Sequence, residues 1–361
     1  MHVTLVSGID PTTPGAGGTR SYVLGLAERL VRRNVSVALV ARDGSSLSFP
    51  GADYVRIRSG PSSARFLLRL VASAPSLPIP RGSIIHVQRP DDLIAFALAK
   101  RRNPKVCTLH GIPAIGVRRR KGTSYGFLYR ALERIGLRGT DRVIAVNAGT
   151  ARWYADRYPR LAGRIDVVPV AVDTERFHPM DQAVARARFG VSAGRVLAYA
   201  GRLTVEKRVE AIVRAIREVP GAELLIAGEG PEEPRLRELA RDAPVRFLGP
   251  IGHEEMPALL NAADVLVLPS EFEGMPTVAL EALACGTPVA ATPVGGLPEV
   301  VVPGKTGWLV EDLDRLPEVL RNALRDAPPM EAACVATART YSWDAVVERI
   351  LAVYRLVEGA A

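Results

Sequence analysis

The sequence has few cysteines, few aromatic residues and no long hydrophobic run. Its 3 Cys lie far apart without the spacing of a metal site, which favours a reducing compartment. No apolar run approaches the roughly 18 residues that a membrane-spanning helix needs. Residues 1–7 lack the basic region of a secretory signal and have the pattern of a first strand. These absences predict a cytoplasmic protein, and 361 residues are enough for two domains.

Positive charge is concentrated in the first half of the chain. Residues 1–175 contain 27 Lys and Arg against 12 Asp and Glu, a net charge of +15. Residues 176–361 contain 20 against 26, a net charge of −6, so the two halves sum to +9. A basic half favours an acidic partner, such as an anionic lipid or a phosphorylated acceptor. A nucleic-acid-binding protein is a weak alternative, because no basic surface is interleaved with aromatic residues and no nucleic-acid motif is present.

Two basic segments of the first half are candidates for contact with an anionic membrane. Residues 64–71 form a short amphipathic segment with Arg65 and Arg69, and residues 118–121 are four consecutive basic side chains. Each basic residue near an anionic surface contributes about 1 kcal/mol. The alternative is a core-facing helix followed by a solvated loop. The charge pattern therefore predicts a protein that visits the inner face of the membrane peripherally.

Short apolar strands alternate with helical patterns along the whole chain, which predicts parallel sheets built from βαβ units. Strands are expected near 3–6, 36–40, 54–57, 84–87, 105–109, 142–145, 166–169, 195–200, 223–227, 245–248, 264–268 and 288–291. The set restarts after the turn-like residues 177–181, the expected linker. The fold class is therefore α/β, with two doubly wound, Rossmann-like domains at 1–175 and 176–342. Their sheets would face a central ligand cleft with their carboxyl ends.

The end of the chain predicts one amphipathic helix within residues 343–361. Its apolar side chains recur at helical spacing and form one continuous stripe. They are Trp343, Val346, Val347, Ile350, Leu351 and Tyr354.

Residues 269–281 predict a loop and a helix start after a buried strand. The apolar run Val265–Leu268 is the strand. Pro276 suits the first helical position, and Gly286 suits the position just past the helix end. The backbone amides of residues 275–278 would then point out of the helix N-terminus, where a phosphate binds readily.

Two carboxylates flank this helix start. Glu273 would lie in the loop above the strand, and Glu281 about a turn and a half inside the helix. Hydroxyl-binding carboxylates on both sides of a phosphate site suit a sugar attached to a nucleoside diphosphate. The alternative from these residues alone is a solvated loop glutamate and a helix-surface glutamate.

The segment resembles the Glu-x7-Glu motif of the retaining nucleotide-sugar glycosyltransferases of family 4, and the resemblance covers nearly the whole chain. The order and spacing of the matching pieces make it specific. One departure is Val170-Ala171, where the family often has Asn-Gly. The other matching pieces are Gly17-Gly18, Thr108–Gly111, Val172–Phe177, Gly201–Lys207, Gly228–Pro231 and Thr292–Gly296.

The resemblance implies roles for five side chains. Arg202 and Lys207, which follow an expected strand, would hold the diphosphate and stabilise the charge that develops on it. Glu281 would bind the ribose hydroxyls, and Glu273 the hydroxyls of the donor sugar. His110 would make a polar contact to the transferred sugar. A solvated basic turn and a structural histidine are the alternatives from the residues alone.

The resemblance also implies a GT-B fold in which the closing helix 343–361 joins the N-terminal, acceptor-side domain. Residues 176–342 would bind the donor sugar nucleotide. No cofactor is implied, and no metal, since Arg202 and Lys207 supply positive charge and Asp312-Leu-Asp314 has the pattern of a solvated loop. The remaining donor-binding residues would be Gly17, Gly18, Gly274, Met275, Pro276 and Thr277.

The function expected from all of this is transfer of a hexose-type sugar, with retention, from a nucleoside diphosphate sugar to a hydroxyl acceptor. The acceptor would be a glycan, a lipid-linked molecule or a small molecule, in glycolipid, cell-envelope polysaccharide or small glycoside synthesis. A nucleotide-sugar epimerase or a phosphorylase on the same scaffold is the main alternative. A dehydrogenase is less favoured, because Arg20 replaces the last glycine of Gly-x-Gly-x-x-Gly, although Asp43 follows the second strand.

Overall fold

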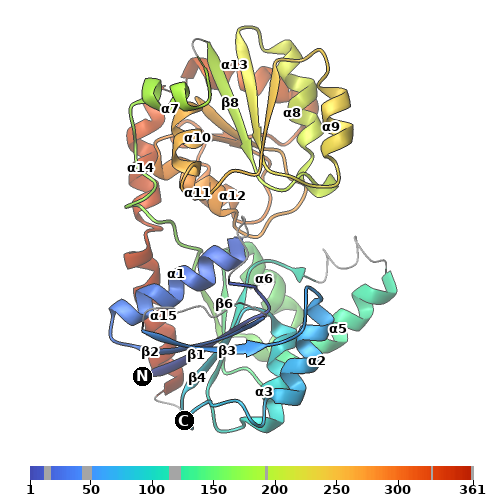
Figure 1. Cartoon of the computed structure of the whole chain (residues 1–361), viewed down its shortest axis with the longest axis vertical. Helices are drawn as coiled ribbons and strands as arrows, with labels where there is room; N and C mark the ends of the chain where they lie inside the picture. Colours follow the sequence, from blue (N-terminus) through green and yellow to red (C-terminus); the bar gives the residue numbers. More distant parts are fainter. Residues whose placement is uncertain (12–17, 43–50, 114–122, 192–193, 327, 359–361) are drawn as a thin grey trace. The chain divides into compact units, whose positions relative to one another are not determined.

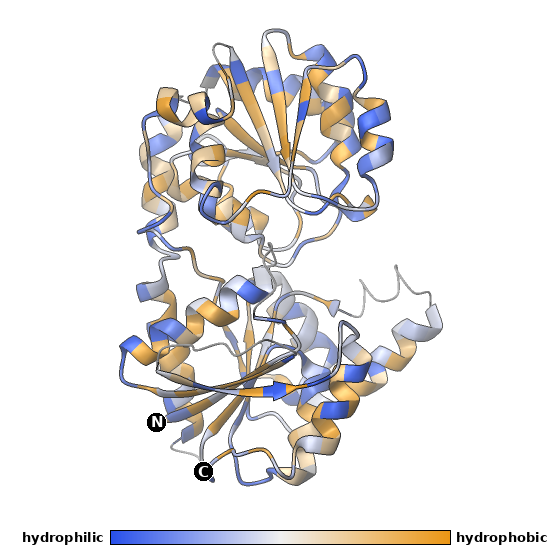
Figure 2. Cartoon of the chain, viewed as in Figure 1, coloured by the Kyte–Doolittle hydropathy of each residue, from blue (hydrophilic) through white to orange (hydrophobic). Residues whose placement is uncertain are grey.

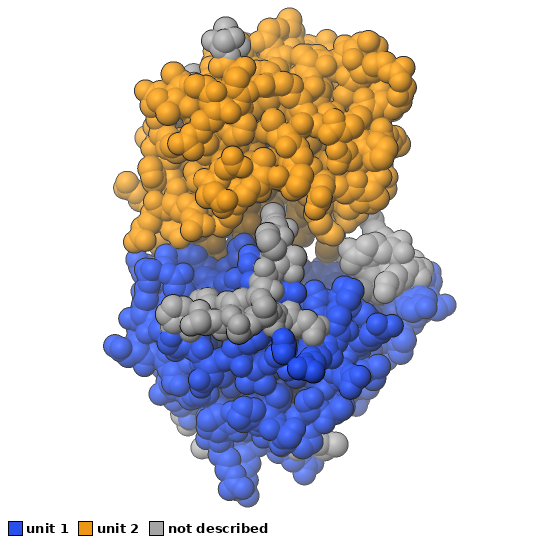
Figure 3. Space-filling view, in the orientation of Figure 1, with its two compact units in different colours: residues 1–170, 343–361 blue, residues 171–342 orange. Residues whose placement is uncertain are grey.

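The computed structural model describes the chain except residues 12–17, 43–50, 114–122, 192–193, 327 and 359–361 (Figure 1). The chain forms two compact units, coloured separately in Figure 3. Unit 1 consists of Met1–Val170 and Trp343–Ala361, and unit 2 of Ala171–Ser342. The second domain is expected to begin at residue 176, whereas unit 2 begins five residues earlier, at Ala171. The reason is that Val172 pairs with Ser342 inside unit 2.

Unit 1 is built on a seven-stranded parallel sheet with the strand order β3-β2-β1-β4-β5-β6-β7. All six neighbouring pairs are parallel, as βαβ connections require. The chain winds outward from β1 to β3 and then returns to β4 on the other side of β1. The strands are β1 His2–Ser7, β2 Ser36–Arg42, β3 Ala52–Ile57, β4 Ile84–Val87, β5 Lys105–Leu109, β6 Arg142–Ala145 and β7 Ile165–Val167.

Helices cover both faces of this sheet (Figure 1). The helices α1 and α15 pack on each other, α1 also packs on β2, and α15 on β4. The helices α2, α3 and α5 form a second packed group. The elements are α1 Gly18–Arg32, α2 Ser63–Ser73, η1 Pro90–Leu93, α3 Ile94–Ala99, α5 Thr123–Leu137, α6 Ala148–Arg157, η2 Pro159–Leu161 and α15 Trp343–Glu358.

Unit 2 repeats the scheme with a six-stranded parallel sheet in the order β10-β9-β8-β11-β12-β13. Here the winding reverses between β8 and β11. The strands are β8 Arg195–Ala200, β9 Ala222–Ala227, β10 Val245–Gly249, β11 Val265–Leu268, β12 Val289–Ala291 and β13 Gly307–Leu309. The helical elements are α7 Gln182–Arg188, η3 Val205–Lys207, α8 Val209–Ala215, η4 Ile216–Glu218, α9 Glu233–Leu239, α10 Met256–Ala262, α11 Thr277–Ala284, α12 Leu297–Val300, η5 Leu313–Arg315, α13 Leu316–Asp326, η6 Pro328–Met330 and α14 Glu331–Arg339.

The inner strands of both sheets are buried on both faces, which explains why they appear in the sequence as continuous apolar runs rather than alternating ones. All four residues of β11 are buried, as are all five of β5. Figure 2 shows the same pattern, with hydrophobic strands and hydrophilic outer helix surfaces in each unit. The prediction of an α/β protein with two parallel, doubly wound sheets is confirmed.

The closing helix α15 follows the expected stripe. All six of its predicted apolar positions are buried, and Trp343 lies beside Tyr22 of α1, with ring centroids 5.8 Å apart. Gly25 on α1 makes this packing possible, because a Cβ there would lie 2.3 Å from the Trp343 ring. Among the described residues, no helix combines the length and the apolar character needed to cross a membrane.

Candidate functional site

The residues singled out in unit 2 gather at its topological switch point. The loop that carries Arg202 and Lys207 follows β8, and the loop that carries Glu273 follows β11. These two strands are hydrogen-bonded neighbours, with Val265 opposite Leu197. In open α/β sheets, the carboxyl ends of the strands on either side of the reversal form the ligand-binding crevice.

Two glycines hold the loop after β8 in place. A Cβ at Gly228 would lie 1.9 Å from the carbonyl oxygen of Gly201, and one at Gly230 would lie 2.2 Å from that of Leu203. Backbone bonds join the same segments, from Leu203 N to the Glu229 carbonyl at 2.9 Å. Close packing therefore explains the glycines of the Gly228–Pro231 motif, since only glycine lets the two loops approach this closely.

Lys207 and Glu273 form an ion pair across the two loops. The Lys207 ammonium donates to Glu273 Oε1 at 2.5 Å, and the Ser270 hydroxyl donates to the same oxygen at 2.7 Å. The side chains are 19% and 10% exposed, so water screens the pair little. A backbone bond from Glu271 N to the Glu206 carbonyl, 2.8 Å, fixes the loops beside it.

Arg202 occupies the outer edge of this cluster. Its side chain is 63% exposed, and its guanidinium is 3.9 Å from Glu206 Oε1. The Tyr199 hydroxyl donates to the Arg202 carbonyl at 2.9 Å, which orders the backbone of this residue. A cation of this kind is accessible to an anionic ligand.

The loop of Glu273 and Gly274 rests on a second glycine pair. Gly296 N donates to the Gly274 carbonyl at 2.6 Å. Gly295 has a φ of +59°, and a Cβ there would lie 2.4 Å from the carbonyl oxygens of both Glu273 and Gly274. The Thr292–Gly296 motif thus shapes the loop that carries the carboxylate.

The helix start follows the prediction with one correction. Pro276 is the N-cap, and the helix begins at Thr277, one residue later than expected, because Pro276 has the extended conformation typical of a cap. Met275 is buried, whereas Pro276 and Thr277 are partly exposed. At the other end, Gly286 has a φ of +83° just past the helix, as predicted.

Glu281 is a buried carboxylate in the middle of α11. The residue is 8% exposed. Within the described part of the chain, no group donates a hydrogen bond to its carboxylate. Burial raises its pKa from 4.5 to about 7, although the charge of Arg176 acts in the opposite direction. Burying a carboxylate without a hydrogen-bond donor costs free energy, and such a group is typical of a site where the partner is a ligand.

In unit 1, His110 directly follows β5 at the carboxyl edge of the sheet. Its Nε2 is 2.9 Å from Gln88 Oε1, and its ring stands edge-on to Tyr22, with centroids 5.0 Å apart. Burial lowers the pKa of His110 to about 4, so the imidazole is neutral at pH 7. With Nε2 donating to the amide oxygen, Nδ1 carries the lone pair.

Gln88 was not among the residues predicted from the sequence. It directly follows β4, the strand next to β5. Its position after an apolar strand is the feature of the sequence that could have indicated a place beside His110. Its Nε2 is buried without a hydrogen-bond partner within the described residues. An unsatisfied buried amide beside His110 marks this edge as a polar site.

Other predicted residues fall elsewhere. Gly18 is exposed and begins α1, whereas Gly17 lies outside the described residues, as do Asp43 and the basic run 118–121. Asp312 and Asp314 are exposed, and the Asp312 side chain accepts from Asp314 N at 2.9 Å, which caps a short turn. Among the described residues, no group of three His, Cys, Asp or Glu is placed to hold a metal ion.

Both halves of the chain match known families of glycosyltransferases. Residues 16–176 match the family described as Glycosyltransferase Family 4, and residues 194–326 match Glycosyl transferases group 1. The D-inositol 3-phosphate glycosyltransferase of Mycobacterium avium is 32% identical over 384 aligned positions, which cover 96% of this chain and 90% of the relative. The chain belongs to glycosyltransferase family 4. It is therefore a glycosyltransferase, as the resemblance implied.

Solved structures agree on the GT-B fold of this family 4 glycosyltransferase. Sucrose-phosphate synthase from Thermosynechococcus elongatus has a TM-score of 0.88 and 25% identity, covering 100% of both chains. The Anabaena protein HepE, in complex with UDP and glucose, has a TM-score of 0.79 and 18% identity, covering 98% of this chain and 99% of that one. Family membership favours sugar transfer over the epimerase, phosphorylase and nucleic-acid-binding alternatives.

Proposed function

We propose that the protein transfers a hexose from a nucleoside diphosphate sugar to a hydroxyl acceptor, with retention of configuration and without a catalytic metal. The observation that carries this proposal is the cluster at the switch point of unit 2. There Lys207 is bonded to Glu273, and the unpartnered carboxylate of Glu281 lies on the following helix.

The three charged groups match three parts of a sugar nucleotide. Arg202 and Lys207 bind the diphosphate, and the exposed guanidinium of Arg202 has the shape to form two parallel hydrogen bonds to phosphate oxygens. The backbone amides at the start of α11 add a phosphate-binding helix N-terminus. Glu281 accepts hydrogen bonds from the ribose hydroxyls. Glu273, with Gly274 and the residues that follow it, binds hydroxyls of the donor sugar.

The same cations stabilise the transition state. As the bond between the sugar and the diphosphate breaks, negative charge grows on the leaving phosphate, beside the ammonium of Lys207 and the guanidinium of Arg202. The leaving group needs no general acid, so a pair of catalytic carboxylates is unnecessary. We propose same-face attack, in which the departing phosphate accepts the proton of the acceptor hydroxyl, and this attack retains the anomeric configuration.

His110 and unit 1 are assigned to the transferred sugar and the acceptor. The neutral His110 makes a polar contact to a sugar hydroxyl, and Gln88 fixes the orientation of its ring. The basic first half of the chain favours an anionic acceptor. D-inositol 3-phosphate, named in the relatives, is the first acceptor to test.

A membrane-bound acceptor is supported by exposed apolar side chains on two helices of unit 1. On α2, Leu68 is 70% exposed, and it lies between the exposed Arg65 and Arg69. On α5, Phe127 and Leu128 are 64% and 58% exposed. Exposed apolar side chains interleaved with arginines are typical of helices that bind an anionic bilayer surface.

The donor site is tested by ligand binding to the two glutamate variants. UDP and UDP-glucose are titrated calorimetrically into the wild type, Glu281→Ala and Glu273→Ala. Glu281→Ala should weaken the binding of both ligands tenfold or more, since both contain ribose. Glu273→Ala should weaken the binding of UDP-glucose only. An equal loss of UDP affinity in both variants would contradict the assignment. The same titrations with other nucleoside diphosphates test whether the donor carries a base other than uracil.

The membrane proposal is tested by vesicle sedimentation. Binding to phosphatidylglycerol vesicles should fall as salt rises, because charge attraction is screened within about 8 Å at physiological ionic strength. Leu68→Ser should reduce binding without changing affinity for UDP, whereas the matched change Val184→Ser, on exposed α7 of unit 2, should not. Equal binding to neutral and anionic vesicles at low salt would exclude an anionic membrane surface as partner.

A further inference from the structure

A basic pocket lies at the amino-terminal edge of the unit 1 sheet, opposite the edge that carries His110. Its volume is about 330 Å³, at the small end of the range for ligand sites. Lys105 begins β5, and a strand rises about 3.3 Å per residue, so the pocket lies about 16 Å from His110. This pocket is therefore separate from the reacting groups proposed above.

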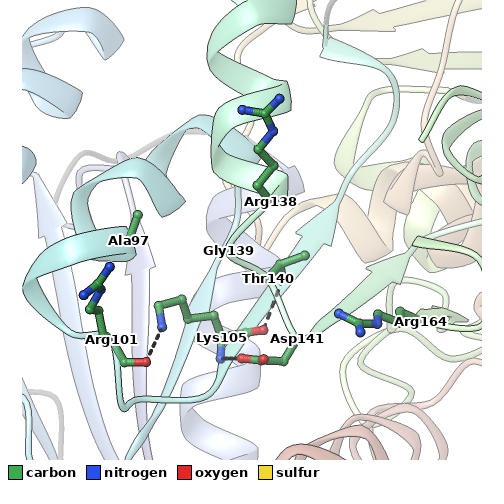
Figure 4. A pocket seen from close by; sticks show the side chains of 8 residues that line it. All are labelled: Ala97, Arg101, Lys105, Arg138, Gly139, Thr140, Asp141 and Arg164. Carbon is green, nitrogen blue, oxygen red and sulfur yellow. Dashed lines mark hydrogen bonds between the residues drawn. The ribbon is translucent and has the colours of Figure 1, made fainter. Parts of the chain in front are cut away.

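Four cations and one carboxylate line the pocket. Figure 4 shows Arg101, Arg138 and Arg164 around Lys105 and Asp141. These side chains come from different segments of the chain, namely the residues after α3, the residues after α5, the start of β5, and the turns before β6 and β7. The lining thus has a net charge of +3 that the fold, rather than one basic run, brings together.

The carboxylate of Asp141, the acidic residue in the pocket, accepts a hydrogen bond from the backbone. Asp141 Oδ2 accepts from Lys105 N at 2.7 Å, a bond that ties the starts of β5 and β6 together. Within the described residues, the guanidinium groups of Arg101, Arg138 and Arg164 have neither an ion pair nor a hydrogen bond. Three exposed guanidinium groups therefore lie around one pocket without an ion-pair partner among the described residues.

Lys105 forms the buried floor of the pocket. The residue is 4% exposed, and its ammonium donates to the Asn103 carbonyl at 2.8 Å and to the Arg101 carbonyl at 3.4 Å. An ammonium has three protons, so one is left for a ligand. Burial lowers the pKa of Lys105, and a bound anion would favour the charged form again.

We propose that this pocket is a second anion site of the protein, which binds a phosphate or diphosphate group. Arginine side chains match phosphate oxygens with paired hydrogen bonds, and the polar lining excludes an apolar ligand. The group belongs either to a soluble phosphorylated molecule or to the head group of a lipid.

The test uses pyrophosphate as the probe and a protein in which the proposed donor site is disabled. Calorimetric titration of Lys207→Ala should still detect pyrophosphate binding. Adding Arg101→Ser, Arg138→Ser and Arg164→Ser to that background should raise the Kd at least tenfold, equivalent to about 1.4 kcal/mol. These arginines are exposed and unpaired, so the thermal unfolding midpoint should change little, and it is measured for every variant.

A matched control removes the same charge elsewhere in unit 1. It carries three exposed arginines changed to serine outside the pocket, and it should bind pyrophosphate like its parent. An equal loss in the control and the pocket variant would show only general charge attraction and would overturn the proposal. So would the absence of binding in the Lys207→Ala parent. The control positions are Arg152, Arg157 and Arg355.

A second arm identifies the source of the phosphate. The same proteins are sedimented with phosphatidylcholine vesicles that contain phosphatidic acid. Loss of vesicle binding in the pocket variant, with retention in the control, assigns the site to a lipid head group. Unchanged vesicle binding together with lost pyrophosphate binding assigns it to a soluble phosphorylated ligand. If the pocket variant retains both activities, the pocket is not an anion site.

Discussion

Replacing Glu281 by Gln should stabilise the empty protein and at the same time weaken nucleotide binding. The carboxylate is buried in α11 with no donor among the described residues, and its pKa is raised from 4.5 to about 7 by burial. The amide of glutamine has nearly the same shape but carries no charge. The variant therefore removes the cost of burying the charge while it leaves the packing of the helix intact.

The size and pH dependence of this effect follow from the pKa values. Between pH 4.5 and about 7 the folded protein holds the Glu281 proton and the unfolded chain does not, so the stability of the wild type falls as pH rises. Each tenfold change in acidity corresponds to about 1.4 kcal/mol, so the full cost of ionisation is about 3 kcal/mol. The cost is small at pH 5 and complete above about pH 7.

Urea unfolding at pH 5 and pH 8 measures this cost. The free energy of unfolding of Glu281→Gln should exceed that of the wild type by about 3 kcal/mol at pH 8 and by less than about 1 kcal/mol at pH 5. Glu311→Gln, at an exposed carboxylate of the same unit, serves as the control and should show no such difference.

The binding half of the prediction separates a ligand-binding role from a structural one. An amide is a weaker acceptor for ribose hydroxyls than a carboxylate, so the Kd for UDP should rise about tenfold, or about 1.4 kcal/mol. A variant that is more stable but binds less tightly shows the usual conflict between stability and function. A Glu281→Gln protein that is less stable at pH 8, or equally stable at both pH values, would refute the reasoning.

Three shorter predictions concern other parts of the two units. Lys207→Met and Glu273→Gln should each cost about 1–3 kcal/mol of unfolding free energy, and a double-mutant cycle should show coupling of about 1 kcal/mol, whereas exact additivity would mean that the pair is not formed. Gly228→Ala should destabilise by about 3 kcal/mol in thermal unfolding because it combines a clash with a φ of +132°, and Gly221→Ala, with open space around it, should cost less. The pKa of His110 is lowered to about 4, so the wild type should lose stability as pH falls from 6.5 to 4, and His110→Gln should lose less in acid denaturation.

Much of the fold was readable from local patterns. Buried parallel strands appear as short apolar runs between helical segments, and twelve of them were expected where β1 to β12 lie. The ends of these strands and the helix start at Thr277 differ by a few residues, because hydrogen bonding at the ends of elements depends on neighbouring segments. The short β13 is not among the expected strands, since its three residues leave little pattern to detect.

The candidate site was readable only as a set of separate residues. Arg202, Lys207 and Glu273 were expected at carboxyl ends of strands, but their spacing did not reveal that Lys207 bonds to Glu273, 66 residues away. Nor did it indicate Gln88 as the partner of His110. Such pairs depend on which strands become neighbours, and strand order is set by long-range packing rather than by any local pattern.

By itself, the sequence determined the α/β class, the doubly wound arrangement, the closing amphipathic helix and the family to which the chain belongs. These follow from hydrophobic periodicity and from short motifs, which act over a few residues. Only the tertiary structure decided the burial of Glu281, the glycine contacts that shape both loops, and the basic pocket around Lys105. Burial and close approach are properties of segments distant in the chain, and they exist only once β8 lies beside β11 and β5 beside β6.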